Sequence, residues 1–205
     1  MNPCDVLLID AGTGNLHSVY NALKSLGVTI HLSSNPQDVA LAGRIILPGV
    51  GAFSSFIDGL HQRELVEPLQ QAVQRGDPLL GICVGMQALF DLSEEMGEHA
   101  GLGLLPGRVI RFKNSTERKI PQTGWNQLHF QRSSPLLKEI PDGCYVYFNH
   151  SYYCSTGDSS CVITTTDYGL AYPSVIQRAN LFGVQFHPEK SQRTGLKILE
   201  NFLKT

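Results

Sequence analysis

The sequence predicts an α/β fold with a mostly parallel central sheet and helices on both of its faces. Short apolar runs that suit buried strands alternate with segments of helical periodicity through the first half of the chain. Glycine-rich turns follow several of these runs, as expected where a strand leads into a helix. The chain has 205 residues and is 42% hydrophobic. A single domain over 1–205 is therefore expected, because two domains would have thin cores.

The first half of the chain supplies the repeated strand and helix units. Strands are expected at 6–10, 28–32, 44–47 and 79–82, and helices at about 16–26, from about 53 to 75, and at 86–92. Connections of this length place helices against a parallel sheet. Ligands of such sheets bind at the carboxyl ends of the strands, which is where the glycine-rich turns of this chain fall.

The second half of the chain has shorter apolar segments and less helix. Strands are expected at 108–112, 127–130, 145–148, 161–166, 174–178 and 181–186, as an antiparallel extension of the same sheet. The polar segment 114–121 is expected to be a mobile surface loop. A last helix at about 194–203 carries Leu196, Leu199 and Leu203 on one stripe, which predicts that it docks on the core.

The charge balance argues against nucleic-acid and membrane partners. The chain carries 16 basic and 18 acidic residues, a formal net charge of -2, and the two signs are interspersed. The apolar run 6–9 is followed at once by Asp10 and glycines, so it is too short for a signal sequence or a membrane span. A cytoplasmic protein is therefore expected.

The five cysteines, at positions 4, 83, 144, 154 and 161, have irregular spacing and include no Cys-x-x-Cys pair. This pattern argues against a disulfide framework and against a zinc site, so free thiols and no metal are expected. The roles of Cys4, Cys144, Cys154 and Cys161 stay open. The turn 12–17 lacks the third glycine of a dinucleotide site, and the chain has no phosphate-binding loop motif, so no cofactor is expected.

One of these cysteines stands at the junction of an expected strand and an expected helix. Cys83 lies between Gly81 and Gly85 as Gly-x-Cys-x-Gly, the thiol version of the nucleophile elbow. In such an elbow a sharp turn presents the reactive atom, and small neighbours relieve crowding. The unpaired N–H groups of a helix N-terminus also favour a thiolate over a thiol. Since a lone cysteine is more often a small buried hydrophobe, the nucleophile hypothesis requires a base elsewhere.

The candidate base is His187, at the end of the last expected strand. Residues two apart in extended backbone point to the same side, so Glu189 can reach the imidazole and fix its tautomer. Cys83, His187 and Glu189 therefore form a candidate catalytic triad. Among the other histidines, His150 lies in an aromatic-rich stretch that suits either the core or the wall of a binding site.

Acyl transfer also needs N–H donors for the oxyanion of the tetrahedral intermediate. The backbone N–H of Val84, directly after the nucleophile, is one candidate. The turn that contains Gly49 and Val50 is the other, since glycines let the backbone approach a substrate closely. Taken alone, this turn fits a simple connection between a strand and a helix equally well.

These motifs resemble those of the class I (triad) glutamine amidotransferases over nearly the whole chain. The resemblance implies the flavodoxin-like fold of that family. It rests on the strand end and turn at 47–53, the nucleophile elbow at 81–87 and the His/Glu motif at 183–191. A narrower similarity, to the glutaminase subunits of imidazole glycerol phosphate synthases, rests on Gly14-Asn15, Gly124-Trp125-Asn126 and 148–152.

The resemblance also implies a reaction. Cys83 would attack the carboxamide of glutamine, a glutamyl thioester would form, and ammonia and then glutamate would be released. His187 would carry protons, and Glu189 would orient it. The positions that match those holding glutamine in the family are Gly51, Gln87, Ser151 and Tyr152.

In this family ammonia passes to a (β/α)₈ barrel cyclase/synthase on a second chain, in histidine biosynthesis, and the resemblance implies the same heterodimer partner here. Asn15, Trp125 and Lys190 match positions near that interface. The glutaminase accounts for all 205 residues. The ammonia is therefore expected to be used elsewhere.

Several residues depart from the family pattern, namely Ala11, Thr13, Val84, Thr123 and Asn149. None belongs to the triad. These departures therefore bear on the identity of the ammonia acceptor and not on the reaction of glutamine. The alternatives are a paralogue that serves another synthase, such as one that modifies sugars, the vitamin B6 glutaminase subunit, and a catalytically silent binding module of the same fold. Gly124-Trp125-Asn126 disfavours the B6 subunit, and the retained triad disfavours the silent module.

Overall fold

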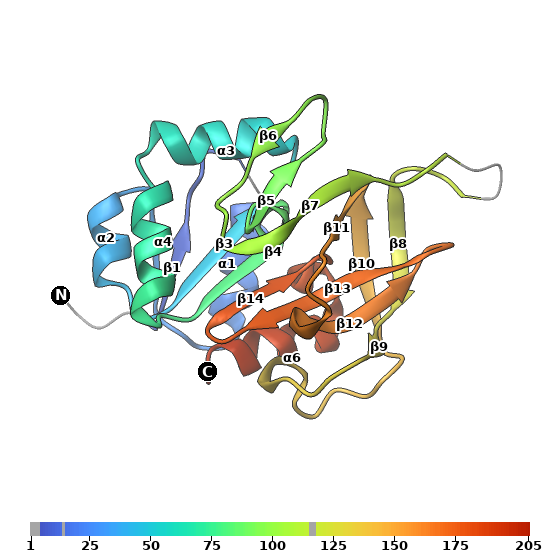
Figure 1. Cartoon of the computed structure of the whole chain (residues 1–205). Helices are drawn as coiled ribbons and strands as arrows, with labels where there is room; N and C mark the ends of the chain where they lie inside the picture. The colour runs from blue at the N-terminus through green and yellow to red at the C-terminus, as the bar shows by residue number, and fades with distance from the viewer. Residues whose placement is uncertain (1–4, 14, 115–117) are drawn as a thin grey trace.

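The computed structural model describes residues 5–13, 15–114 and 118–205, in which eight strands form one large sheet (Figure 1). In their order across the sheet these strands are β2 (Ile30–Ser33), β1 (Val6–Ile9), β3 (Ile45–Gly49), β4 (Leu79–Cys83), β14 (Leu181–Val184), β13 (Ala171–Arg178), β12 (Val162–Asp167) and β9 (His129–Phe130). The first five run parallel, and the last three are antiparallel to their neighbours. The predicted mixed sheet, mostly parallel at its centre, is confirmed.

Helices cover both faces of this sheet, as predicted. They are α1 (Leu16–Ser25), α2 (Pro36–Leu41), α3 (Phe53–Gln62), α4 (Val66–Arg75), α5 (Val84–Gln87) and α6 (Gln192–Phe202), with short 3₁₀ turns η1 (Pro135–Leu137), η2 (Ser159–Cys161) and η3 (Pro188–Lys190). Helices α1 and α6 contact each other on one face, and α2 contacts α4 on the other (Figure 1). Gly76, in a left-handed conformation, ends α4 before the chain enters β4.

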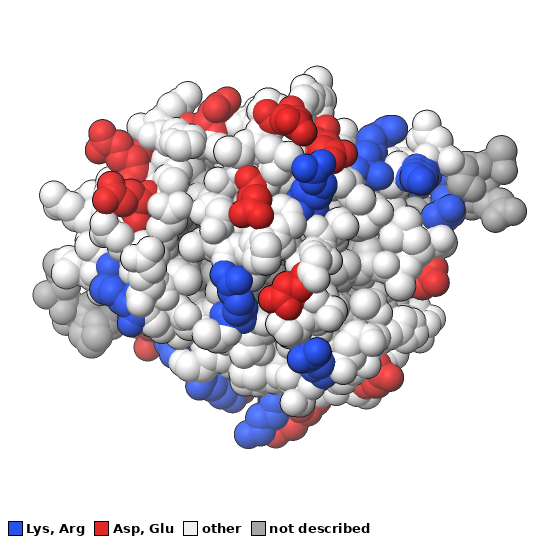
Figure 2. Space-filling model, viewed as in Figure 1, with Lys and Arg blue, Asp and Glu red and all other residues white. Residues whose placement is uncertain are grey.

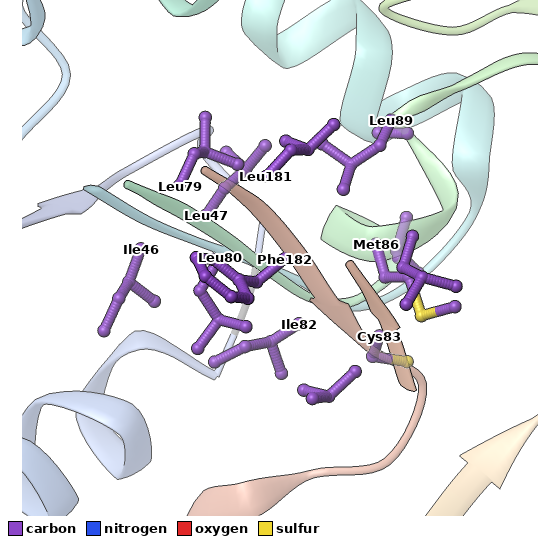
Figure 3. Packing of buried hydrophobic residues seen from close by; sticks show 14 of the residues in the cluster. Ile46, Leu47, Leu79, Leu80, Ile82, Cys83, Met86, Leu89, Leu181 and Phe182 are labelled. Carbon is purple, nitrogen blue, oxygen red and sulfur yellow. The ribbon is translucent and has the colours of Figure 1, made fainter. Parts of the chain in front are cut away.

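The central strands are buried because helices lie on both sides of them. Every residue of β3, β4 and β14 is buried, including Leu47, Leu80 and Phe182. Figure 3 shows these side chains packed together, with Cys83 at the edge of the cluster beside Ile82 and Met86. This core holds the carboxyl ends of the three strands in place. The candidate site lies at these ends.

Two smaller sheets lie beside the large one. One pairs β8 (Gln122–Gln127) with β10 (Tyr145–His150), and the other has the order β11 (Tyr152–Ser155), β7 (Leu105–Arg111), β5 (Phe90–Ser93) and β6 (His99–Ala100). The prediction of one antiparallel extension is therefore right for β9, β12 and β13 and wrong for β7, β8 and β10. It is also wrong for β14, which pairs in parallel with β4. Only some residues of β7 and β8 are buried, so these strands form outer layers instead of joining the buried sheet.

The helix predicted at 86–92 is wrong beyond Gln87. Only α5, one turn long, follows Cys83, and the chain then enters β5. The carbonyl of Ala88 accepts the N–H of Leu102, and the carbonyl of Leu89 accepts the N–H groups of Leu104 and Leu105. These long-range hydrogen bonds take the acceptors that a longer helix would need, so tertiary pairing overrides the helical periodicity.

The surface carries mixed charge. Figure 2 shows Lys and Arg interspersed with Asp and Glu over the face in view. None of the helices in the described part of the chain combines the length and apolar character needed to cross a membrane. Of the segment predicted as a mobile loop, residues 115–117 lie outside the described ranges, as do Cys4 and Gly14.

Candidate active site

The carboxyl ends of three neighbouring parallel strands meet at the candidate site. β4 lies between β3 and β14, with Gly49 of β3 in register with Cys83 of β4 and Val184 of β14 in register with Ile82. The residues that follow Val184 therefore reach the level of Cys83. One edge of the sheet thus brings together three segments that are far apart in the sequence. They are the turn after β3, the elbow after β4 and the His/Glu motif after β14.

Cys83 occupies a sharp turn, as the elbow motif predicts. Its backbone has φ 54° and ψ -110°, a positive φ that costs a non-glycine residue about 1–3 kcal/mol. The two flanking glycines permit this turn to form. A Cβ on Gly81 would lie 2.6 Å from the Gly85 carbonyl oxygen, and a Cβ on Gly85 would overlap the carbonyl oxygen of Leu47 on β3. The elbow is therefore packed backbone against backbone on the strand beside it.

His187 and Glu189 form a buried pair beside this cysteine. The Nδ1 of His187 lies 2.9 Å from Oε1 of Glu189, and the side chains are 4% and 1% exposed. A carboxylate only accepts, so Nδ1–H donates to it, which leaves Nε2 for the sulfur. Burial opposes the charged imidazole, but hydrogen bonds with Cys83 and Glu189 outweigh burial and raise the pKa of His187 from 6.5 to about 10.

The backbone around the pair holds it in place. The N–H of His187 donates to the Tyr147 carbonyl of β10 at 2.9 Å. The hydroxyl of Ser191 donates to the His187 carbonyl at 2.7 Å and accepts the N–H of Tyr147 at 2.9 Å. Ser191 is buried, so this bridge between the His/Glu turn and β10 is shielded from water.

A cavity of about 590 Å³ opens in front of the cysteine. Its walls come from the ends of β3, β4 and β14 and from the connection between β10 and β11. The lining residues are Asn15, Val50, Gly51, Cys83, Val84, Gln87, Glu95, Pro121, Asn149, His150, Ser151, Tyr152, His187 and Lys190. A cavity of this size suits a small polar metabolite.

His150 lines the same cavity but in a different environment. Its Nδ1 donates to the Tyr152 carbonyl at 2.8 Å, and its Nε2 faces the Tyr172 hydroxyl at 3.3 Å. Burial lowers the pKa of His150 to about 4, although the hydrogen bond to the Tyr152 carbonyl opposes that shift. His150 is therefore a neutral residue of the cavity wall. It is also buried, so both environments expected from the sequence, the core and the wall of a binding site, apply to it.

The proposed oxyanion residues lie around the sulfur. Val50 and Val84 line the cavity, and Gly49 lies opposite Cys83 at the end of β3. A Cβ on Gly49 would lie 2.7 Å from the backbone nitrogen of Gly85 and 2.8 Å from the Phe56 ring, so only glycine lets β3 approach the elbow this closely. Gly51, with φ +92°, turns the chain toward α3.

Comparison with known proteins places this site in a family. The family model described as glutamine amidotransferase class-I matches residues 7–205. The chain belongs to the class-I glutamine amidotransferase family.

Curated relatives of this amidotransferase are similar over most of their length. The imidazole glycerol phosphate synthase subunit HisH of Salinibacter ruber is 49% identical over 200 residues, which cover 95% of this chain and 92% of that protein. The subunit of the same name from Moorella thermoacetica is 49% identical over 197 residues, covering 96% and 93%. A solved glutamine amidotransferase has a TM-score of 0.75 at 19% identity and covers 97% of both chains, which supports the fold alone.

All four positions that the resemblance assigned to glutamine line the cavity of this amidotransferase: Gly51, Gln87, Ser151 and Tyr152. The Nε2 of Gln87 donates to the Tyr152 carbonyl at 3.0 Å, so two of these positions are joined directly. Of the three positions assigned to the partner interface, Asn15 and Lys190 line the cavity, whereas Trp125 does not and is 46% exposed.

Sequence reasoning missed two polar residues of the amidotransferase site. Glu95 lines the cavity and accepts the N–H of Phe53, the first residue of α3, at 2.7 Å. Gln185 is fully buried and contacts both Gln87 and Cys83. Glu95 follows a short strand that periodicity did not reveal, so no local signal marked it. Gln185 belongs to the His/Glu motif at 183–191. Its position two residues before His187, which places both side chains on the same side of an extended chain, was a signal for its presence in the site.

Of the described cysteines, those other than Cys83 do not line the cavity. Cys144, Cys154 and Cys161 are free thiols, as is Cys83. Burial raises the pKa of Cys154 well above its ordinary value and also raises that of Cys144 and Cys161, which keeps these thiols protonated and unreactive. Within the described ranges, no three His, Cys, Asp or Glu side chains gather as a metal site would require.

Proposed function

We propose that this chain is the glutaminase subunit of an imidazole glycerol phosphate synthase, which hydrolyses glutamine and supplies ammonia to a cyclase subunit. The observation that carries the proposal is the single cavity in which Cys83 lies beside the buried His187–Glu189 pair. The near full-length similarity to subunits of that name supports the choice within the family.

In the proposed reaction the thiolate of Cys83 attacks the carboxamide carbon of glutamine. The C–N bond breaks, and the imidazolium of His187 gives its proton to the departing nitrogen, so ammonia leaves and a glutamyl thioester remains. Water then attacks the thioester and passes a proton to His187. The C–S bond breaks with its electron pair on sulfur, and glutamate is released. Because its pKa is about 10, His187 holds the proton that the first step needs.

The negative oxygen of each tetrahedral intermediate requires donors, and the proposal assigns this role to the backbone N–H groups of Val50 and Val84. Both residues line the cavity beside the sulfur. Gly49 contributes by letting its strand approach the elbow. Loss of one such donor typically costs about 10²- to 10³-fold in rate.

Glutamine carries an α-ammonium group and an α-carboxylate, and the cavity offers partners for both. Glu95 supplies a carboxylate on the wall, which suits the ammonium group, and Lys190 supplies a cation. Gly51, Gln87, Ser151 and Tyr152 are proposed to hold the remainder of the substrate. Direct recognition of the charged ends would exclude apolar amides of similar size.

The ammonia acceptor is proposed to be a (β/α)₈ cyclase/synthase subunit that binds over the cavity mouth, on the face that carries Asn15, Trp125 and Lys190. Trp125 packs edge-on against Tyr147 at 6.1 Å, and the Lys190 Nζ lies 5.7 Å from the Tyr147 ring centroid. A partner that binds Trp125 would therefore act, through Tyr147, on Lys190, which lines the cavity. A cytoplasmic location remains part of this proposal, supported by the free thiols.

The proposal is tested by measuring glutamate release from glutamine. The purified chain is assayed alone, and then with the cyclase subunit of the same organism and its ribonucleotide substrate. We expect weak activity alone, strong stimulation in the mixture, and no activity for Cys83→Ala under either condition. Absence of stimulation by a cyclase that is active on free ammonia would assign this glutaminase to a different acceptor. Activity that survives Cys83→Ala would overturn the proposed nucleophile.

A further inference from the structure

Gln185 lies level with Cys83, directly after the neighbouring strand β14. Val184 of β14 pairs with Ile82 of β4, so residue 185 stands beside residue 83. The Gln185 side chain is fully buried, and its Nε2 lies 3.8 Å from the Cys83 sulfur. Within the described ranges the sulfur is the only hydrogen-bond acceptor that this nitrogen meets. An unpaired buried amide donor would cost about 1–3 kcal/mol, so the contact with sulfur also satisfies Gln185.

A backbone carbonyl fixes the direction of this hydrogen bond. The Tyr152 carbonyl oxygen, which can only accept, lies 3.0 Å from the Gln87 amide, so the Gln87 end that faces it is the NH₂ group. The same nitrogen lies 3.2 Å from the Gln185 amide, whose facing end must then be the oxygen. The opposite end of Gln185, which faces the sulfur, is therefore its NH₂ group and donates.

We propose that Gln185 is a further catalytic residue, which donates an N–H to the sulfur of Cys83 and stabilises the negative charge that the sulfur carries. This inference rests on the proposed function of Cys83 as the nucleophile. The helix after Cys83 is a single turn, so its dipole is smaller than that of the longer helix expected from the sequence. Gln185 and His187, two residues apart, supply stabilising groups for the sulfur in its place.

The role of Gln185 is greatest when the sulfur is charged. In the proposed first step the sulfur attacks as a thiolate, and in the second step the C–S bond of the thioester breaks and returns an electron pair to it. In both states the Gln185 N–H faces a negative sulfur, whereas in the thioester it faces a neutral one. Because Gln87 lines the cavity and orients the Gln185 amide, a substrate bound to Gln87 helps to hold this donor in place.

Other titratable groups lie next to the sulfur, bond to such a group or line the same cavity, and they must be kept constant in a test. They are His187 and Glu189 after β14, Cys154 on β11 and His150 at the end of β10, with Glu95 and Lys190 further along the cavity wall. Substitution of Gln185 leaves all of these groups in the protein. A change in the ionisation of Cys83 can then be attributed to the lost donor.

The test is the pH dependence of Cys83 alkylation in the full chain. The rate of modification by iodoacetamide is followed by peptide mass spectrometry across a pH series. In Gln185→Leu the donor is removed, and in Gln185→Glu a carboxylate of the same shape replaces it. We expect the profile midpoint of Gln185→Leu to lie about one pH unit higher, so that at any pH below both midpoints this variant reacts roughly tenfold more slowly, a difference of about 1.4 kcal/mol. Gln185→Glu is expected to shift at least as far.

Gln122→Leu is the matched control, because Gln122 is also a buried amide but bonds to Tyr172 instead of the sulfur. Its midpoint should match that of the unmodified sequence. Circular dichroism reports whether each variant folds, and Gln185→Met, which removes the donor without adding a charge, decides the result if Gln185→Leu does not fold. An unchanged midpoint in a folded Gln185 variant would overturn the role of Gln185. Glutamine hydrolysis that persists in Cys83→Ala would instead overturn the proposed nucleophile, so the two failures are distinguishable.

Discussion

Two histidines line one cavity and differ in charge, since His187 is protonated and His150 is neutral. The pKa of His150 is about 4 because burial acts on it without a nearby carboxylate, whereas that of His187 is about 10 because Glu189 and Cys83 hydrogen-bond to its imidazole. Burial alone would make both neutral. The difference in charge between the two histidines is therefore set by the hydrogen bonds that His187 makes with Cys83 and with Glu189, two positions along the chain.

This account predicts the titration of His187. Since its pKa is raised, the imidazole should remain protonated from pH 6.5 up to about pH 10, where an ordinary histidine is neutral. Glu189→Gln keeps an acceptor near Nδ1 but removes the charge, so the pKa of His187 should fall. Glutamine turnover with the partner should then decrease by roughly 10²- to 10⁴-fold. Nuclear magnetic resonance of the imidazole protons across the pH range measures the first effect, and glutamate release measures the second.

Glu67→Gln is the control for this variant, because Glu67 is exposed on α4 and its side-chain partner is Gln71. It should leave both measurements unchanged. A His187 that titrates near pH 6.5 in the unmodified sequence would show that the pair with Glu189 does not hold the proton.

At the scale of elements, the central parallel strands were predictable and the helix after the nucleophile was not. β1, β3 and β4 are continuous apolar runs buried on both faces, a pattern that is visible in the sequence. The periodicity of 86–92 indicates a helix, yet the amides of Leu102, Leu104 and Leu105 take the carbonyls of residues 88 and 89. Nothing local to 86–92 reveals those donors, so the error follows from tertiary hydrogen bonding.

The elbow depends on close contact between elements, and Gly85→Ala tests this. A Cβ at Gly85 would overlap the Leu47 carbonyl, so α5 must move away from β3. We expect a loss of about 1–3 kcal/mol in the free energy of unfolding, the usual cost of overpacking, and a large loss of glutaminase activity because the sulfur moves with α5. Urea denaturation and glutamate release measure the two effects.

Gly43→Ala is the matched control, because a Cβ at Gly43 meets nothing within 4 Å. Its unfolding free energy should change by less than about 0.5 kcal/mol, as is usual for surface substitutions. A Gly85→Ala variant as stable as Gly43→Ala would mean that α5 can shift from β3 without strain.

At the scale of the whole molecule, the predicted triad residues come together because each stands at the end of a strand. Parallel strands of one sheet end at the same edge, so a cysteine after β4 and a histidine after β14 meet once the strand order is known. Glu95 and Gln185 show the limit of this reasoning. Glu95 reaches the cavity through a small sheet that the sequence did not reveal, and the importance of Gln185 depends on a contact with another strand.

The proposed partner face gives the last prediction. Trp125 is 46% exposed on β8, outside the cavity, and packs on Tyr147, whose ring also lies under Lys190. A large exposed aromatic side chain held by its neighbours has the character of an interface hot spot. Trp125→Ala should therefore raise the cyclase concentration needed for half-maximal stimulation by roughly 10- to 100-fold, since such residues contribute about 2 kcal/mol or more.

Two comparisons separate lost binding from a damaged site. Alkylation of Cys83 in the lone Trp125→Ala chain should proceed at the normal rate, because Trp125 does not line the cavity. Leu41→Ala removes another exposed apolar side chain, 67% exposed on α2, and should leave stimulation unchanged. If Trp125→Ala responds to the cyclase at the same concentration as Leu41→Ala, the ammonia acceptor does not depend on this face. A different docking surface would then have to lie close to the cavity in which we propose that glutamine is hydrolysed.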